Sequence, residues 1–297
     1  MENYRDVPVI PIDPVVLVDH PSDTGEGPLW DDTTNTLTWN DIPAGTLFRY
    51  DPARRTNVVV YQHTAQIGGH TLQADGSLVL FSEHGQILQW KNGSVETIVD
   101  SIPEVAGSRF NDVIADPAGN VFCGTMPLEN GAATLYRLDT AGKLTVVWDD
   151  LTLSNGMGFS PDHSTFYLSD SNSRTVYRAE YDNGEIRNRE VLIRLDDQQA
   201  VPDGMTVDAN GDLWVAVWDG NCLLHYSDTG DLIDKVMFPV RKASSISFGN
   251  ANYETAFVTT AGGKNRDDDE GRLAGSLFAV SIPDVQGKPD FRSRILL

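Results

Sequence analysis

The segment GEGPLWDD (25–32) recurs in pattern, although not in letters, at five further places along the 297-residue chain. Each copy joins a short hydrophobic run to turn-forming residues, and the others are GGHTLQAD (68–75), FNDVIADP (110–117), NGMGFSP (155–161), DGMTVDA (203–209) and SSISFGNA (244–251). Their equivalent positions are Asp32, Asp75, Pro117, Pro161, Ala209 and Ala251, which follow one another at intervals of 43, 42, 44, 48 and 42 residues. A period in the forties with strand-like content is typical of the blades of a β-propeller.

The sequence around each copy predicts strands and no helices. Runs such as Asn120 to Gly124 and Asp212 to Val217 are rich in β-branched and aromatic residues, and the turn clusters DPAG (116–119) and DANG (208–211) precede them. No segment keeps a 3.6-residue apolar spacing over a dozen positions. We therefore predict an all-β, six-bladed propeller of four-stranded antiparallel blades, with residues 1–297 as a single domain. A strand at about 14–19 is expected to close the last blade beside Leu277 to Val280.

Composition excludes several classes of partner. The formal net charge of −21 disfavours nucleic acid and anionic membranes as partners, because binding them needs clustered Lys and Arg.

The sequence shows no signal for a membrane or for secretion. No apolar stretch approaches the ~20 residues that cross a bilayer, and the N-terminus lacks a secretory signal pattern. Cys123 and Cys222 lie in apolar strand patterns and are predicted to be buried thiols, so we expect a cytoplasmic protein. The acidic run at 267–270 is predicted to be a solvated loop.

Four of the six repeats carry a carboxylate or an amide at the same position, and these residues are Glu26, Asn111, Asn155 and Asp203. The other two repeats have Gly69 and Ser245 there. In a propeller this position would be the start of the strand that lines the central channel. Asn-Gly and Asp-Gly pairs also make turns, but that alternative does not explain Glu26 or the shared register. Carboxylates and amides without thiolate or imidazole suit a hard divalent cation.

Other residues near these positions have both a structural and a functional interpretation. Arg109 lies two residues before Asn111, on the same face of an extended strand, and could hold substrate oxygens or be an ordinary surface arginine. Glu129 is either a substrate contact or a solvated loop acid, and His70 either part of the pocket wall or a packed histidine. The run DANGD (208–212) imitates the start of an EF-hand loop, but it lacks the flanking helices and is interpreted as a β-turn.

Several motifs together resemble the SMP-30/gluconolactonase/LRE-like family, from about residue 24 to 280. They are GEGPLW (25–30), SRFND (108–112), DPAGN (116–120), GTM (124–126), SNGM (154–157), YLSDS (167–171), PDGMTVD (202–208) and LAGSLFA (273–279). The resemblance implies a six-bladed propeller with one divalent ion at the channel mouth. It implies that Glu26, Asn155 and Asp203 are the metal ligands and that Asp203 is also the general base. It moves Asn111 from ligand to substrate contact, together with Arg109 and Glu129.

The hypothesis from sequence is therefore a metal-dependent lactonase that opens sugar lactones, such as glucono-, xylono- or arabinonolactone, to aldonic acids. The expected cofactor is one divalent ion, with Ca²⁺ first and Zn²⁺, Mn²⁺, Mg²⁺ or Fe²⁺ as alternatives. The expected partner is the small-molecule lactone alone, with no obligate protein partner. Two other functions stay open, namely a phosphotriesterase or aryl-esterase on the same metal site, and a non-catalytic cation-binding propeller.

Overall fold

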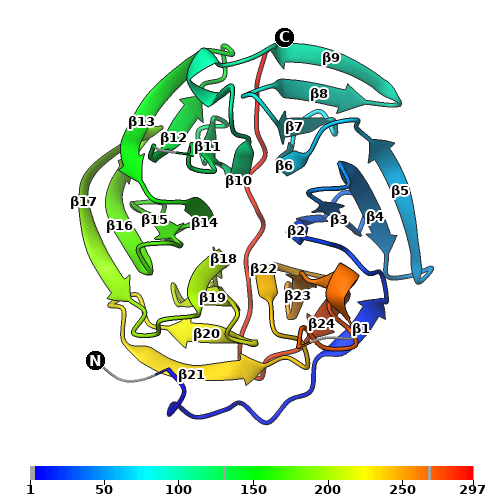
Figure 1. The fold of residues 1–297 in the computed structure, drawn as a ribbon, viewed down its shortest axis with the longest axis vertical. Helices are drawn as coiled ribbons and strands as arrows, with labels where there is room; N and C mark the ends of the chain where they lie inside the picture. Colours follow the sequence, from blue (N-terminus) through cyan, green and yellow to red (C-terminus); the bar gives the residue numbers. More distant parts are fainter. Residues whose placement is uncertain (1–3, 130, 267–268, 297) are drawn as a thin grey trace.

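The computed structural model describes residues 4–129, 131–266 and 269–296, and it shows six four-stranded antiparallel sheets arranged radially around one axis (Figure 1). This confirms the predicted all-β, six-bladed propeller. The first two blades are β2 (Gly25–Asp31), β3 (Thr36–Asp41), β4 (Thr46–Asp51) and β5 (Thr56–Gln62), then β6 (Ile67–Leu72), β7 (Leu78–Ser82), β8 (Ile87–Lys91) and β9 (Ser94–Val99). The third and fourth are β10 (Phe110–Ala115), β11 (Val121–Thr125), β12 (Ala133–Leu138) and β13 (Leu144–Leu151), then β14 (Ser154–Phe159), β15 (Thr165–Asp170), β16 (Thr175–Asp182) and β17 (Glu185–Arg194).

The fifth blade consists of β18 (Val201–Val207), β19 (Leu213–Trp218), β20 (Cys222–Tyr226) and β21 (Leu232–Met237). The sixth combines the two ends of the chain, because β22 (Ala243–Gly249), β23 (Thr255–Thr260) and β24 (Leu277–Val280) are completed by β1 (Val15–Val18). In this outermost pairing Val15 lies opposite Ala279, and Val16 opposite Phe278. Two short 3₁₀ helices, η1 (Pro103–Val105) and η2 (Gly263–Asn265), lie in connections.

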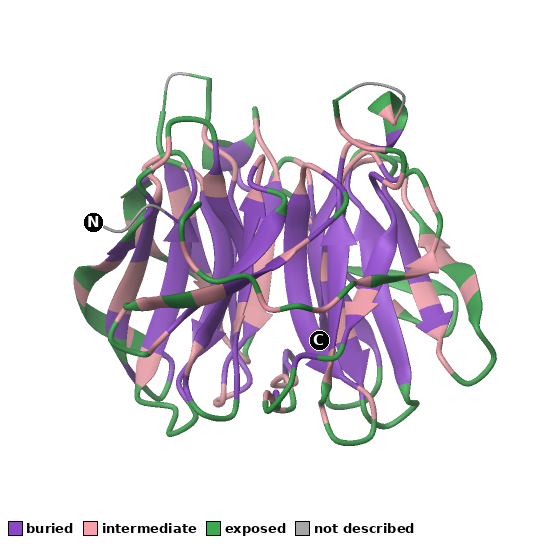
Figure 2. Ribbon diagram, turned by 90° about the horizontal axis from the view of Figure 1, so that it is seen from below, coloured by how far each residue is buried: buried purple, intermediate pink, exposed green. Residues whose placement is uncertain are grey.

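The hydrophobic core lies between neighbouring blades, where both faces of the inner strands are covered. Figure 2 shows the inner strands buried and the exposed residues on the outer strands and loops. One cluster, for example, joins Phe81 of the second blade to Phe110 and Val121 of the third. Cys123 and Cys222 are buried and unpaired, as the sequence predicts. Within the described ranges there is no helix with the length and apolarity to cross a membrane.

Residues 286–296 form an extended segment, here called the C-terminal strap, that crosses the middle of the ring (red in Figure 1). It bonds to all six blades at the end of the channel where the inner strands finish. The strap residues Gln286, Gly287, Ser293 and Arg294 make backbone hydrogen bonds to Ala209, Tyr253, Leu72 and Gly119, respectively. The Lys288 side chain bonds to the Phe159 carbonyl, and the Arg292 side chain to the Asp31 carboxylate. The sequence patterns did not predict this segment.

The prediction of a solvated acidic run at 267–270 is wrong for its last member. Asp267 and Asp268 lie outside the described residues, and Asp269 is exposed. The Glu270 carboxylate, however, is largely covered and pairs with the Lys242 ammonium, which also contacts Asp219 at 3.1 Å. The ion pair with Lys242 therefore explains why the Glu270 carboxylate is shielded from solvent.

Candidate metal site at the channel mouth

The six innermost strands β2, β6, β10, β14, β18 and β22 form a closed ring, since each contacts the innermost strands of both neighbouring blades. Each of these strands has a break in its hydrogen-bonding register with the next strand of its blade. The break lies at or next to the position of Glu26 and its equivalents in the sequence repeat. The irregularities lie at Glu26/Leu29, Ile67/Gly69, Phe110/Val113, Ser154/Met157, Pro202/Met205 and Ala243/Ser245. A β-bulge bends the strand and redirects side chains, and bulges are common next to functional sites. The repeated bulge therefore gives the channel mouth a common geometry in all six blades.

Small residues let these strands approach closely at the mouth. A Cβ built on Gly156 of β14 would lie 2.3 Å from the Met205 nitrogen and 2.5 Å from the Asp203 oxygen of β18. A Cβ on Gly204 of β18 would meet the Ser245 side chain of β22 at 2.2 Å. Glycine is thus required at both positions, because only glycine lets the backbones approach closely enough to bring Asn155 and Asp203 together.

Asn155 and Asp203 make direct contact. The Asn155 Nδ2 group donates to Asp203 Oδ1 and to the Ser171 hydroxyl at 3.0 Å, and Ser171 donates in turn to the Pro202 carbonyl at 2.7 Å. These acceptors fix the orientation of the amide. Asn155 Oδ1 and Asp203 Oδ2 are left buried without a hydrogen-bond partner among the described residues. Buried polar atoms are normally paired, so these two oxygens are free to bind a ligand.

Asn111 differs from Asn155 because both ends of its amide are already bonded. Its Nδ2 group donates to the Ser154 carbonyl at 3.0 Å, and its Oδ1 accepts from the Arg109 guanidinium at 2.7 Å. Arg109 and Asn111 thus meet, as expected from their spacing. The Asn111 amide oxygen is therefore already engaged by Arg109, unlike the oxygen of Asn155.

Glu26 lies on β2 and is 4% exposed, as is Asp203. Its Oε2 accepts a hydrogen bond from the Gly27 nitrogen at 3.1 Å. Burial raises the pKa of Glu26 well above its usual value, and the neighbouring Asp112 and Asp203 carboxylates raise it further. Burial also raises the pKa of Asp203, with a further contribution from Asp112.

Asp112, which sequence analysis did not single out, is therefore part of the electrostatics of the mouth. Burial raises the pKa of Asp112 to about 7, although the Arg109 guanidinium opposes the shift. Three carboxylates and one guanidinium sum to a charge of −2 when all are ionised. A divalent cation would neutralise that charge, and the bare oxygens of Asn155 and Asp203 offer it hard donors. The residues present therefore fit a divalent metal.

The other two predicted site residues are placed differently. His70, on β6, is buried, and its Nε2 lies 2.8 Å from the Thr38 hydroxyl. That hydroxyl lies 3.3 Å from the Leu29 carbonyl, to which it donates. Burial lowers the pKa of His70 to about 4. Glu129 lies on an exposed turn after β11 and makes no hydrogen bond or ion pair with any described residue.

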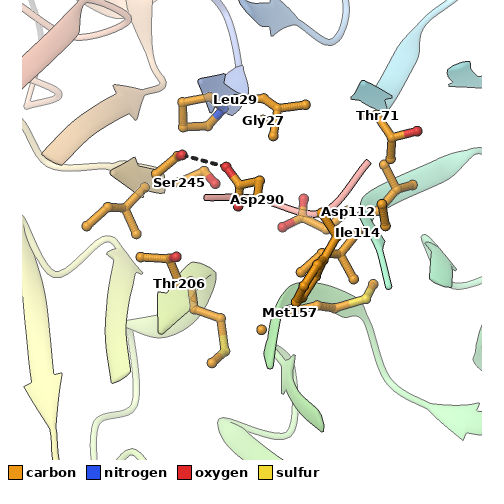
Figure 3. Close-up of a pocket in the computed structure, with 18 of the residues that line it drawn as sticks. Gly27, Leu29, Thr71, Asp112, Ile114, Met157, Thr206, Ser245 and Asp290 are labelled. Carbon is orange, nitrogen blue, oxygen red and sulfur yellow. Dashed lines mark hydrogen bonds between the residues drawn. The ribbon is translucent and has the colours of Figure 1, made fainter. Parts of the chain in front are cut away.

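A cavity of about 90 Å³ lies in the channel between the inner strands and the C-terminal strap. Figure 3 shows Asp112, Thr206, Ser245 and Asp290 around it. The Asp290 carboxylate accepts a hydrogen bond from the Ser247 hydroxyl at 3.1 Å. Burial raises the pKa of Asp290 to about 6. The strap forms the floor of this space and the mouth residues lie at the other ends of the same strands.

The chain is similar in sequence and in structure to proteins of known name. Residues 24–262 match the model of the SMP-30/Gluconolactonase/LRE-like region. The pentonolactonase XacC of Haloferax volcanii is 39% identical over 95% of this chain and 98% of its own length. Regucalcin of Gallus gallus is 34% identical over 90% of this chain and 93% of its own length. The crystal structure of the calcium-binding protein regucalcin from Agrobacterium tumefaciens superposes with a TM-score of 0.89, at 24% identity over 97% of this chain and 99% of that one.

Proposed function

This chain belongs to the SMP-30/gluconolactonase/LRE-like family, and we propose on that basis that it is a metal-dependent hydrolase that opens sugar lactones to aldonic acids. The observation that carries the proposal is the pair of bare, buried oxygens on Asn155 and Asp203 beside the Glu26 carboxylate. The Haloferax volcanii relative, which aligns over 95% of the chain, is named a pentonolactonase. Five-carbon lactones such as xylono- and arabinonolactone are therefore the first candidates, with gluconolactone next.

Glu26, Asn155 and Asp203 would hold the metal, with Asn155 Oδ1 and Asp203 Oδ2 as two of the donor atoms. When bound, a divalent cation supplies Lewis-acid polarisation of an ester carbonyl. Because every donor in this set is oxygen, Ca²⁺ is the first candidate and Mn²⁺, Mg²⁺, Zn²⁺ and Fe²⁺ are alternatives.

Asp203 would act as the general base. Its Oδ1 is held by the Asn155 amide, so Oδ2 is the free atom. One lone pair of Oδ2 would face the metal, and the other could accept a proton. In the reaction, the oxygen of a water molecule forms a bond to the lactone carbonyl carbon and loses its proton to Asp203. The bond to the ring oxygen then breaks, and that oxygen takes the proton to become a hydroxyl. In the metal-free protein, burial raises the pKa of Asp203. A cation bound beside it would oppose that shift and favour the ionised carboxylate that a base must be.

Arg109, Asn111 and Glu129 would position the sugar. The hydrogen bonds of Arg109 within the described residues use only one guanidinium nitrogen, NH1. Its remaining N–H groups are therefore available for the hydroxyl or carbonyl oxygens of a polar substrate. Glu129 would accept hydrogen bonds from sugar hydroxyls, and His70 would form part of the wall. Holding the lactone in this way lowers the entropic part of the barrier.

The test is hydrolysis measured in a pH-stat on protein that has been stripped with a chelator and reloaded with Ca²⁺, Mn²⁺, Zn²⁺, Mg²⁺ or Fe²⁺. The substrate panel contains xylono-, arabinono- and gluconolactone, with an organophosphate triester and an aryl ester beside them. We expect turnover of lactones by the reloaded protein only. Asp203→Asn serves as the catalytic variant, and Asp231→Asn, an exposed residue on the same blade, is its charge-matched control.

Faster turnover of the triester or aryl ester than of any lactone would replace the proposal with a phosphotriesterase or esterase. Stoichiometric metal binding without turnover of any substrate would favour the non-catalytic propeller. Hydrolysis by Asp203→Asn at the rate of Asp231→Asn would remove Asp203 from the role of base.

A further inference from the structure

A second group of potential metal ligands lies on the fifth blade, at the opposite end of β18 from the channel mouth. It consists of Asp208 and Asp212, in the turn between β18 and β19, and of His225 on β20. The nearest ligand atoms of these three residues all lie within 4.8 Å of one another. Asp203, at the mouth, precedes Asp208 by most of the length of β18, so the two groups are separate.

Asp208 is rigidly placed. Its Oδ1 accepts hydrogen bonds from the backbone nitrogens of Asn210, Gly211 and Asp212, at 2.8 to 3.0 Å. Its Oδ2 accepts from the Trp214 indole nitrogen at 3.1 Å. The turn interpretation of DANGD (208–212) is therefore correct, but it accounts for Asp208 alone. A carboxylate oxygen has two lone pairs, so Asp208 Oδ2 can accept one further partner.

His225 is oriented by a carboxylate and a stacked ring, as metal-binding histidines commonly are by a carboxylate. It is only 9% exposed, and its ring stacks on the Trp214 ring, with centroids 4.1 Å apart and an angle of 10° between the planes. Its Nδ1 lies 2.9 Å from the Asp234 carboxylate, which can only accept when ionised, so Nδ1 carries a proton. A carboxylate on one imidazole nitrogen orients the ring and increases the basicity of the other nitrogen toward a metal.

The other ring nitrogen, Nε2, is buried and has no hydrogen-bond partner in the described part of the chain. It lies 3.4 Å from Asp212 Oδ2, without the geometry of a hydrogen bond. The Asp212 side chain makes no hydrogen bond of its own to the described residues. A doubly protonated imidazole would form an ion pair with Asp212 at this distance. In the neutral ring, a buried lone pair faces a carboxylate oxygen, and a cation between them would relieve the repulsion.

We propose that Asp208, Asp212 and His225 form a second divalent-cation site, of the type that binds Zn²⁺. Zinc bonds to nitrogen and oxygen ligands are about 2.0–2.2 Å long and usually tetrahedral, which places neighbouring ligand atoms about 3.4 Å apart. The distance from His225 Nε2 to Asp212 Oδ2 has this value. One imidazole and two carboxylates favour Zn²⁺ over Ca²⁺, in contrast to the oxygen donors of the mouth.

The role of the site follows from what it connects. A bound ion would tie the β18–β19 turn, through Asp208 and Asp212, to β20, and through Asp234 to β21. All four strands of the fifth blade would then share one cross-link at the end of the blade remote from the mouth. The ion would stabilise the folded chain by mass action without taking part in hydrolysis.

The experiment counts metal ions on the full chain. Chelator-stripped protein is titrated with Zn²⁺ in competition with a chromophoric chelator, and with Co²⁺ while visible absorption is recorded. We expect two Zn²⁺ per wild-type chain and the intense visible bands of tetrahedral Co²⁺. Asp212→Asn should lose one Zn²⁺ and those bands, whereas Glu26→Gln should lose the other Zn²⁺ and keep the bands.

Asp234→Asn is a second variant that leaves the three ligands in place. Loss of an orienting partner weakens metal binding about 10–100-fold, so its Zn²⁺ affinity at this site should fall by that factor. Asp231→Asn, the exposed control on the same blade, should match wild type. An unchanged Zn²⁺ count in Asp212→Asn overturns the proposal, whether wild type binds one ion or two. Lactone hydrolysis by Asp212→Asn should stay at the wild-type level, so failure here is distinguishable from failure of the proposed function.

Discussion

A single amide illustrates how a proposed metal ligand is oriented in this protein. The Nδ2 group of Asn155 is bonded to two acceptors, which leaves Oδ1 facing the mouth with no partner. The repeat register could point to Asn155 from the sequence alone, because an oxygen-bearing residue recurs there. It could not point to Ser171, since that residue lies after the next strand and reaches Asn155 only through the fold.

Ser171→Ala tests this positioning role. The variant removes one of the two acceptors that orient the amide, so we expect metal affinity to fall about 10–100-fold. Turnover at saturating metal should recover to near the wild-type value, since the Ser171 hydroxyl is buried and bonded to Asn155 and the Pro202 carbonyl. Ser164→Ala, in an exposed turn, is the matched control. Equal metal affinities in the two variants would contradict the role of Ser171.

The carboxylates at the mouth predict how pH acts on the metal-free protein. Burial raises the folded-state pKa of Glu26, Asp203 and Asp112, that of Asp112 to about 7. The folded state therefore holds more protons than the unfolded state, and the stability that protonation gives is lost as pH rises through about 7. Between about pH 5.5 and pH 8 we expect the chelated protein to lose about 2 kcal/mol, or roughly 5 °C in Tm.

Differential scanning fluorimetry of chelated and metal-loaded protein at both pH values measures this effect. Metal should raise Tm more at the higher pH, because protons and cation compete for the same carboxylates. Asp112→Asn should reduce the pH dependence of the chelated form. A chelated protein whose Tm rises over this interval would refute the assignment of these carboxylates.

Among the strands, the repeated bulge is the feature that the sequence did not reveal. Asn155-Gly156 and Asp203-Gly204 are compatible with either a turn or a strand, and the apolar residues that follow indicated the strand correctly. The structure places both pairs inside β14 and β18 at a bulge. A bulge depends on pairing with the neighbouring strand, so local sequence preferences could not distinguish it from regular strand.

Gly156→Ala is the corresponding prediction for β14. The added methyl group would meet the β18 backbone at 2.3 Å and 2.5 Å, which backbone atoms cannot relieve by a change of rotamer. Forcing extra atoms into such a contact costs about 1–3 kcal/mol, and it should also separate Asn155 from Asp203. Both chemical denaturation and metal titration should show a loss.

Gly107→Ala is the control, since its added methyl group would meet only a Leu128 side-chain atom at 3.7 Å. If Gly156→Ala were as stable and bound metal as tightly as Gly107→Ala, the close approach of β14 and β18 would not matter for the site.

At the scale of the whole molecule, the C-terminal strap holds the ring at the end away from the mouth. The periodicity of the sequence predicted six blades correctly, but the strap has no strand pattern of its own and bonds to segments from every blade. Its position depends on the completed ring, which explains why sequence reasoning could not place it.

Replacing residues 286–297 with a Gly/Ser tail of equal length should remove the bonds of the strap to all six blades. Each hydrogen bond contributes about 1 kcal/mol, so we expect the loss of several kcal/mol and a fall in Tm of about 10 °C. Thermal and urea unfolding measure the change. An unaltered Tm would mean that the strap lies on the ring without stabilising it.

The pairing of β1 with β24 separates two partners by most of the chain. During synthesis on the ribosome, the Val15–Val18 segment emerges early and must wait for Leu277–Val280 before it has a neighbour. Through that interval it is a short apolar strand with an open edge, the kind of segment that pairs with other nascent chains. The contact that closes the ring is thus also the one that exposes the growing polypeptide to aggregation for longest.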